Sequence, residues 1–198
     1  MKKKLLITLS VVACALLLVA GSIAGTIAYL TSNDTVTNTF TVGHVKITMD
    51  ETDVDVYGKK ETDTRVKGNT YKLLPGHSYI KDPVIHVTKG SEECWLFVKV
   101  VDQLSDIEAS ETVVEQLTAN GWIELAGVEN VWYHAKVDAR DVDADVDVEV
   151  FENFNVRNDA TVSTYTGKTI VVTAYAIQAD GFDTAEKAWT AASSEFGN

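Results

Sequence analysis

Apolar and polar residues alternate along most of this chain, and this period of two constrains its fold more than any other feature. Residues 142–154 alternate strictly, and residues 169–178 are rich in β-branched side chains. Successive side chains of a strand point to opposite faces, so the pattern predicts half-buried β-strands. The nearly continuous apolar run from Cys94 to Asp102 predicts a strand that is covered on both faces.

Two segments depart from this alternation and predict short helices. Apolar residues recur on one helical face in residues 106–120, which end at Asn120-Gly121, and again in residues 182–192. Many short strands, glycine-rich turns and one or two helices favour a mainly β fold. We expect an antiparallel β-sandwich of the jelly-roll kind.

The first 28 residues have the order of a secretory signal peptide. Lys2, Lys3 and Lys4 precede an apolar run that begins at Leu5, and small residues follow it. Such a segment enters the export machinery as a helix, and small residues fit the pockets of a signal peptidase. We predict a signal peptide over residues 1–28, cleavage between Ala28 and Tyr29, and a secreted protein at the cell surface or in a matrix.

Three alternatives for this segment remain open. Cleavage before Gly25 also satisfies the small-residue rule. The apolar stretch of residues 5–30 is long enough to remain as an uncleaved membrane anchor, which needs roughly 20 residues. Residues 11–14 resemble a lipobox, so lipidation at Cys14 is the third alternative.

Charge and cysteine content exclude several classes of partner. The chain has a net charge of −12, and the predicted signal peptide holds three lysines and no acid, so the mature chain is more acidic still. Such a surface repels nucleic acid and anionic lipid, so we expect no nucleic-acid partner, and membrane contact only through the signal segment. Cys94 is alone in the mature chain, which leaves it the role of a small buried hydrophobe or of an intermolecular thiol bridge.

No catalytic, cofactor or metal site is predicted from local motifs. The four histidines (His44, His77, His86 and His134) are scattered, and no pair has the one-turn spacing of a zinc peptidase helix. Acidic residues form two clusters, and in the second they occur at every second position: Asp50, Glu51, Asp53 and Asp55, then Asp141, Asp143, Asp145, Asp147 and Glu149. A solvated strand face explains such a row best, and calcium binding is the alternative.

Residues 29–40 form a polar, threonine-rich extension without proline. An extended segment of this kind can add to the open sheet edge of a neighbouring copy, and head-to-tail repetition of that contact produces a filament. It can equally pair within its own sandwich or stay disordered. The candidate donor-strand residues are Leu30, Thr31, Val36, Thr37, Thr39 and Phe40.

Several stretches, in this order, resemble the TasA, CalY and camelysin family of exported Gram-positive proteins. They are residues 25–34 around the cleavage site, residues 38–47 as a first strand, Leu74-Pro75-Gly76-His77 with Lys81-Asp82-Pro83, and residues 165–178 as a last strand. The resemblance implies a jelly-roll domain over residues 41–198 and processing by a SipW-type signal peptidase. For the best-known members it also implies assembly into biofilm-matrix fibres by donor-strand exchange.

The sequence therefore predicts a non-enzymatic surface or matrix protein that forms a head-to-tail homopolymer. A camelysin-like metallopeptidase is one alternative, and it would use His77, His86 or His134 with nearby carboxylates. A monomeric surface adhesin or binding module is the other.

Overall fold

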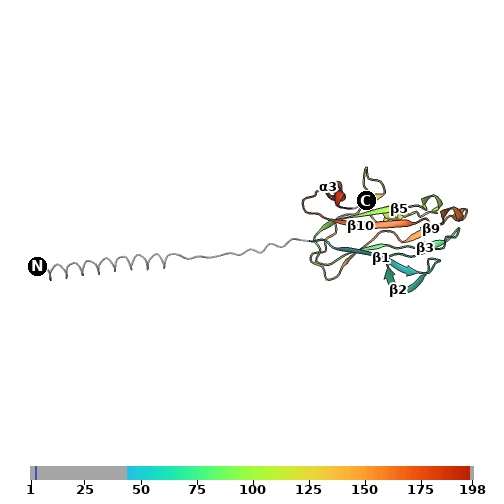
Figure 1. Ribbon diagram of the computed structural model, residues 1–198, viewed down its shortest axis with the longest axis horizontal. Helices are drawn as coiled ribbons and strands as arrows, with labels where there is room; N and C mark the ends of the chain where they lie inside the picture. Colours follow the sequence, from blue (N-terminus) through green and yellow to red (C-terminus); the bar gives the residue numbers. More distant parts are fainter. Residues whose placement is uncertain (1–2, 4–43, 197–198) are drawn as a thin grey trace. The chain divides into compact units, whose positions relative to one another are not determined.

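The computed structural model describes residue 3 and residues 44–196 (Figure 1). The predicted signal peptide, its Ala28–Tyr29 cleavage site and the extension of residues 29–40 with its candidate donor residues all lie outside the described residues. Within the described part, the helices are too short or too polar to span a bilayer. All strands and helices named from here on lie within residues 44–196.

Ten strands form two four-stranded antiparallel sheets and one two-stranded sheet. The first sheet has the order β2 (Lys60–Val66), β1 (Ile47–Val54), β4 (Val84–Val87), β8 (Val146–Glu149). The second has the order β10 (Ile170–Gln178), β5 (Cys94–Asp102), β7 (Val131–Tyr133), β6 (Ile123–Glu124). The third pairs β3 (Ser78–Ile80) with β9 (Asn153–Asn155). The prediction of a mainly β, antiparallel protein with two short helices is confirmed.

The helical elements are short and lie in the connections. They are η1 (Ser105–Ile107), α2 (Val113–Ala119), η2 (Val162–Tyr165), α3 (Ala185–Ala192) and η3 (Ser193–Glu195). The prediction of a helix over residues 106–120 is confirmed for its second half, where α2 ends before Asn120, but its first half is wrong because Ser105–Ile107 form the separate η1. Thr112 explains the late start of α2: its side chain accepts from the Glu115 N–H, and the Glu115 carboxylate accepts from the Thr112 N–H.

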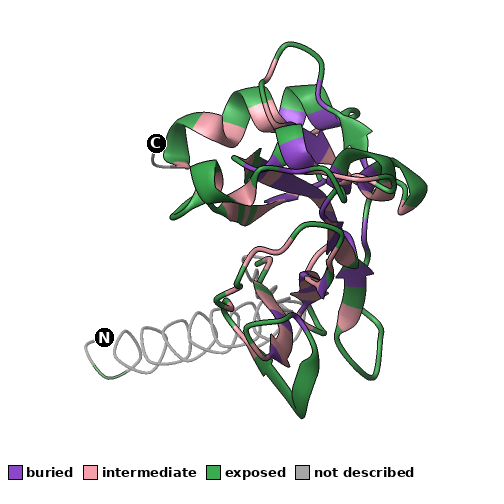
Figure 2. Ribbon diagram, turned by 90° about the vertical axis from the view of Figure 1, so that its right-hand side faces the viewer, coloured by how far each residue is buried: buried purple, intermediate pink, exposed green. Residues whose placement is uncertain are grey.

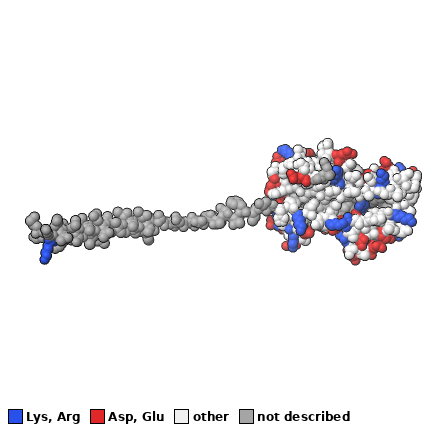
Figure 3. Space-filling view, in the orientation of Figure 1, with Lys and Arg blue, Asp and Glu red and all other residues white. Residues whose placement is uncertain are grey.

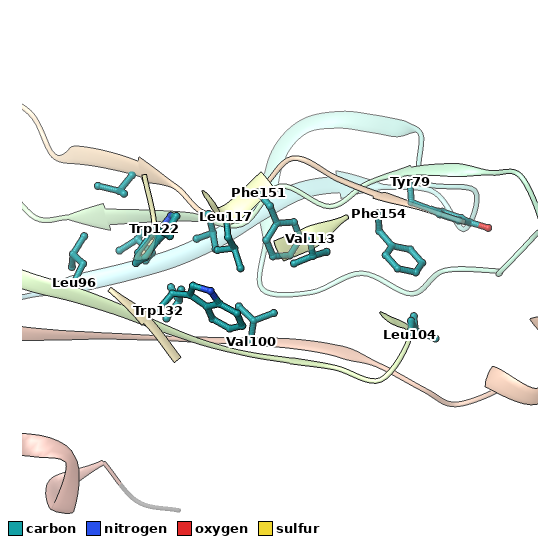
Figure 4. Close-up of a cluster of buried hydrophobic side chains, with 14 of the residues drawn as sticks. Tyr79, Leu96, Val100, Leu104, Val113, Leu117, Trp122, Trp132, Phe151 and Phe154 are labelled. Atoms are coloured by element: carbon teal, nitrogen blue, oxygen red, sulfur yellow. The ribbon is translucent and has the colours of Figure 1, made fainter. Parts of the chain in front are cut away.

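Two clusters of buried side chains hold the layers together. The main cluster fills the space between the sheets, and Figure 4 shows it running from Leu96 and Trp122 to Phe154 and Tyr79. The second lies under α3, where Phe97 meets Ala185 and Ala188. Figure 2 shows the buried stretches inside the layers and the exposed positions on the connections.

Strand β5 contributes to both clusters, which confirms that this run is covered on both faces. Leu96, Val98 and Val100 belong to the main cluster and Phe97 to the second. Cys94 is fully buried at the start of the strand, as expected of a small hydrophobe. Burial, followed by the negative charges of Glu93 and Asp138, raises the pKa of its thiol to about 11.

A matched pair of substitutions tests this core. Val98 has no exposed surface, whereas Val114 on α2 is 52% exposed. We expect Val98→Ala to lower the free energy of unfolding by about 2 kcal/mol, through lost apolar burial and the cavity left behind. Val114→Ala should change it by less than about 0.5 kcal/mol, since alanine favours a helix and little burial is lost. Urea unfolding followed by circular dichroism measures both, and equal losses would contradict this assignment.

Candidate functional site

The outer strand of the second sheet, β10, is paired on one side only. It is nine residues long and pairs with β5 over its whole length, from Ile170 opposite Asp102 to Gln178 opposite Cys94. No strand pairs with its other side among residues 44–196. We call this unpaired side of Ile170–Gln178 the β10 edge. It is the longest sheet edge of the described part and therefore the first candidate for a binding site.

The hydrogen bonds at the two ends of β10 show which backbone groups point outward. The Gln103 N–H donates to the Thr169 carbonyl over 3.1 Å, and the Ala179 N–H donates to the Glu93 carbonyl over 2.7 Å. Successive residues of an antiparallel strand direct their backbone groups to alternate sides. The odd-numbered residues therefore bond to β5, and the even-numbered residues direct their N–H and C=O groups outward at the β10 edge.

The same even-numbered residues carry apolar side chains that are only half covered. Ile170, Val172, Ala174 and Ala176 pack against the main core cluster but stay partly exposed. A further strand at the β10 edge would therefore gain main-chain hydrogen bonds and cover apolar surface at the same time.

The first half of β1 flanks the same opening from the other sheet. Ile47 and Met49 are also half-buried against the main cluster, and β2 begins to pair with β1 only at Glu51. Side chains cover part of this stretch, since Arg65 Nη2 donates to the Asp50 carbonyl over 3.0 Å. Strands β10 and β1 are neighbours in the fold, and Figure 1 shows their ribbons running alongside each other. Figure 3 shows uncharged side chains on this side of the described part, with both basic and acidic side chains scattered among them.

A pocket of about 590 Å³ lies at the Ile170 end of the β10 edge, and we call it the end pocket. About half of its lining residues are aromatic or aliphatic, and the rest are mostly polar, with Lys72, Lys81 and Lys168 among them. The aromatic and aliphatic residues are Tyr71, Leu73, Tyr79, Leu104, Phe154, Val162, Tyr165 and Ile170. The Tyr71 and Tyr79 hydroxyls donate to the Ile80 and Lys72 carbonyls, over 3.0 and 2.6 Å. Because these hydroxyls are engaged, the two tyrosines offer ring surface, and a pocket of this size accepts an apolar or aromatic group.

The three histidines of the peptidase alternative do not converge on one site. His86 and His134 line one hollow of about 540 Å³ together with Asp147 and Glu149. His77 lies instead beside the end pocket, where the centre of its ring is 4.9 Å from that of the Tyr79 ring. Among residues 44–196, no group of three or more histidine, cysteine, aspartate or glutamate side chains is arranged to hold a metal ion.

The five acids of the second row are all exposed, as a solvated face predicts, but the prediction that they lie on one strand was wrong. Residues 141–145 belong to no strand, and β8 begins only at Val146. The Asp145 carboxylate accepts from the Lys89 N–H over 2.9 Å, just beyond the last β4–β8 pair, Val87 opposite Val146. In the first row, Glu51 is buried and its carboxylate bonds to Lys81 Nζ over 2.8 Å. Asp55 accepts the N–H groups of a turn that joins β1 to β2. Calcium binding stays an untested prediction.

A network that joins all four strands of the first sheet escaped the sequence analysis. His86 bonds through Nδ1 to Asp147, at 2.6 Å, and through Nε2 to Asp50, at 3.0 Å. Arg65 reaches Asp50 as well, and its Nη1 lies 3.3 Å from Asp82 Oδ2. Only strand register brings these side chains together, because His86 lies opposite Asp147 in the β4–β8 ladder.

The network shifts the pKa of its members. Burial lowers the pKa of His86, but its bonds to Asp50 and Asp147 outweigh burial, so the net pKa is raised. Burial raises the pKa of Asp50, but the bonds from Arg65 and His86 leave its net pKa lowered. Both shifts favour a charged pair on the outer face of the sheet.

Compared with protein-family models, with curated proteins and with solved structures, the chain gives no significant match. Any assignment of function therefore depends on the geometry described above and on the sequence motifs.

The raised pKa of His86 predicts a pH-dependent contribution to stability. This contribution is complete below about pH 6.5, the ordinary pKa of histidine, and is lost as the pH rises through the raised value. We expect His86→Gln to destabilise the protein most at pH 6 and progressively less toward pH 8.5.

Unfolding of both proteins in urea at several pH values measures this difference. His134→Gln is the matched control, because that imidazole packs on Trp122 and bonds to the Ala135 carbonyl. A destabilisation by His86→Gln that grows from pH 6 to 8.5 would contradict the assignment.

Proposed function

We propose that this protein is an exported structural protein of the cell surface or extracellular matrix that assembles into fibres by strand addition. The observation that carries this proposal is the β10 edge, which combines unpaired backbone groups with half-covered apolar side chains. The partner is a second copy of this chain, and a SipW-type signal peptidase releases the strand that it donates.

The β10 edge lacks the features that normally protect a sheet edge. Natural edge strands are short, or they carry lysine, inward-pointing charge, proline or a bulge. Residues 170–178 contain no charged residue and no proline, and their pairing with β5 is regular throughout. An unprotected edge of this length is an aggregation hazard unless a defined strand covers it.

Residues 29–40 are suited to cover this edge. At about 3.3 Å per residue, the nine residues of β10 span about 30 Å, and the extension spans about 40 Å when extended. In an extended chain Leu30, Val36 and Phe40 share one face, and Thr31, Thr37 and Thr39 share the other. The face of Leu30, Val36 and Phe40, which also carries Ser32, Asp34 and Asn38, would cover the core, and the threonine face would point away from it.

The proposal also includes a jelly-roll arrangement of the strands. Two four-stranded antiparallel sheets around one core are compatible with a jelly roll. A signal peptide over residues 1–28 would leave Tyr29 at the new amino terminus, so export itself would make the donor segment available. Metal, cofactor and catalytic residues have no part in this function.

The donor segment can be tested by truncation. We expect the chain that begins at Tyr29 to form filaments, visible by electron microscopy and as a rise in light scattering. The chain that begins at Thr41 should stay monomeric, because it keeps the β10 edge but has no strand to donate. A synthetic peptide of residues 29–40 should bind the truncated chain and, in excess, stop growth of the longer one. Filaments from the truncated chain would contradict the proposal.

The acceptor edge can be tested by one substitution. Ala174 directs its N–H outward, so Ala174→Pro removes a donor at the β10 edge without touching the β5 ladder. We expect loss of filaments with an unchanged unfolding midpoint. Ala174→Ser keeps the N–H and should restore growth. Val172→Lys places a charge on the same edge and supplies a second variant in case the proline lowers stability.

Two other outcomes would redirect the proposal. A chain from Tyr29 that stays monomeric under all conditions, with and without calcium, would favour a surface adhesin. Proteolysis by the pure protein that a chelator abolishes would favour the metallopeptidase.

A further inference from the structure

We propose that the donated strand runs antiparallel to β10 and inserts Phe40 into the end pocket of the acceptor. This inference rests on the proposed function and adds to it the direction of the strand, its anchor and the polarity of the fibre. It depends on where the described chain begins relative to the end pocket.

The chain enters the domain at the end of β10 that lies far from the end pocket. The His44 carbonyl accepts from the Glu92 N–H over 3.1 Å, and the next residue, Glu93, accepts from Ala179, just beyond the end of β10. The end pocket lies at the start of β10 and includes Ile170. Each copy therefore releases its own extension near Gln178 and holds its end pocket near Ile170.

Strand direction decides what kind of assembly follows. The chain of an antiparallel donor leaves the acceptor at the Ile170 end of β10, and the donor's domain lies beyond that end. The acceptor's own extension leaves from the other end, near Gln178. Every copy then has a free donor at one end and a free acceptor at the other, which builds an open head-to-tail fibre. A parallel donor leaves at the Gln178 end, beside the acceptor's own extension, and two such copies can close into a reciprocal dimer.

The end pocket distinguishes the two directions by the residue that it would receive. An antiparallel donor brings Phe40 to the Ile170 end, whereas a parallel donor brings Leu30 there. The lining includes the rings of Tyr71 and Tyr79, which meet edge to face with centroids 5.6 Å apart, and that of Phe154, 6.3 Å from Tyr79. The ring of Phe40 would extend this arrangement, since aromatic groups prefer tilted or edge-to-face contacts at such separations.

Part of the polar lining of the pocket is already paired, which suits an uncharged aromatic occupant. Lys81 is paired with the buried Glu51, and Asn69 donates to the same carboxylate over 2.9 Å, while Lys72 and Lys168 also line the pocket. The Leu74 N–H is satisfied by the Tyr79 hydroxyl over 2.7 Å. A phenylalanine ring would meet apolar surface in the pocket without displacing these bonds.

Substitutions in the donor test the anchor. In the chain beginning at Tyr29, we expect Phe40→Ala to raise the protein concentration needed for filament growth at least tenfold. Leu30→Ala should raise it less than threefold, and Phe40→Trp should restore growth at least partly. A larger effect of Leu30→Ala than of Phe40→Ala would overturn the inference and indicate the parallel direction.

The same series separates this inference from the proposed function. Suppose that Phe40→Ala forms filaments at the same protein concentration as the wild-type chain, while the chain beginning at Thr41 forms none. That result would reject Phe40 as the anchor but would leave strand addition in place. A wild-type chain that never assembles would reject both.

Cross-linking tests the direction without altering Phe40. Chains that carry Thr41→Cys are mixed with chains that carry a second cysteine position and a tag, which makes them longer and distinguishes them on a gel. The second position is either Lys168→Cys, at the pocket end, or Asp180→Cys, at the opposite end. Positions 168 and 180 are exposed, and the native Cys94 is fully buried and does not compete. Under oxidation we expect a mixed disulfide dimer with Lys168→Cys only. A mixed dimer with Asp180→Cys only would overturn the antiparallel assignment, and the parallel strand would replace it.

Discussion

Burial of β5 on both faces is the interaction on which the rest of the structure depends. Leu96 and Val98 join the cluster between the sheets, and Phe97 joins the cluster under α3. One strand thus ties the second sheet to the first on one side and to the C-terminal helix on the other. Burying apolar surface is the dominant favourable term in folding, so a strand that does so on two faces fixes the layer order.

Strand β10 shows what this central strand makes possible. Its full-length ladder with β5 holds it rigidly in place, and its odd-numbered residues Tyr175 and Ile177 are covered through the α3 cluster. The other side of β10 can therefore stay unpaired without fraying. A rigid, preformed edge loses little conformational freedom when a strand adds to it, which is the condition for tight strand addition.

The first sheet is stabilised differently, by ion pairs and hydrogen bonds between polar side chains of neighbouring strands. Strand β2 is almost entirely exposed and polar, and it forms an irregular hairpin with β1, whose register shifts between Thr52 and Val54. It is held by Arg65, which reaches Asp50 and Asp82, and by its ladder with β1. The alternating acids of residues 141–149 predict one long strand, but pairing with β4 extends only from Val146 to Glu149.

The sequence by itself determined the strand-forming segments. Period-two alternation and β-branched runs predict strands close to Cys94–Asp102 and Ile170–Gln178, because the pleat puts every second side chain on one face. Pro83 lies between β3 and β4, outside both strands, and this position suits a residue that has no N–H to donate to a ladder. Only the tertiary structure decided which strand lies at an edge, where the end pocket forms, and that His86 meets two aspartates. These features depend on pairing between residues far apart in the chain. The local pattern of a strand does not indicate which other strand will pair with it.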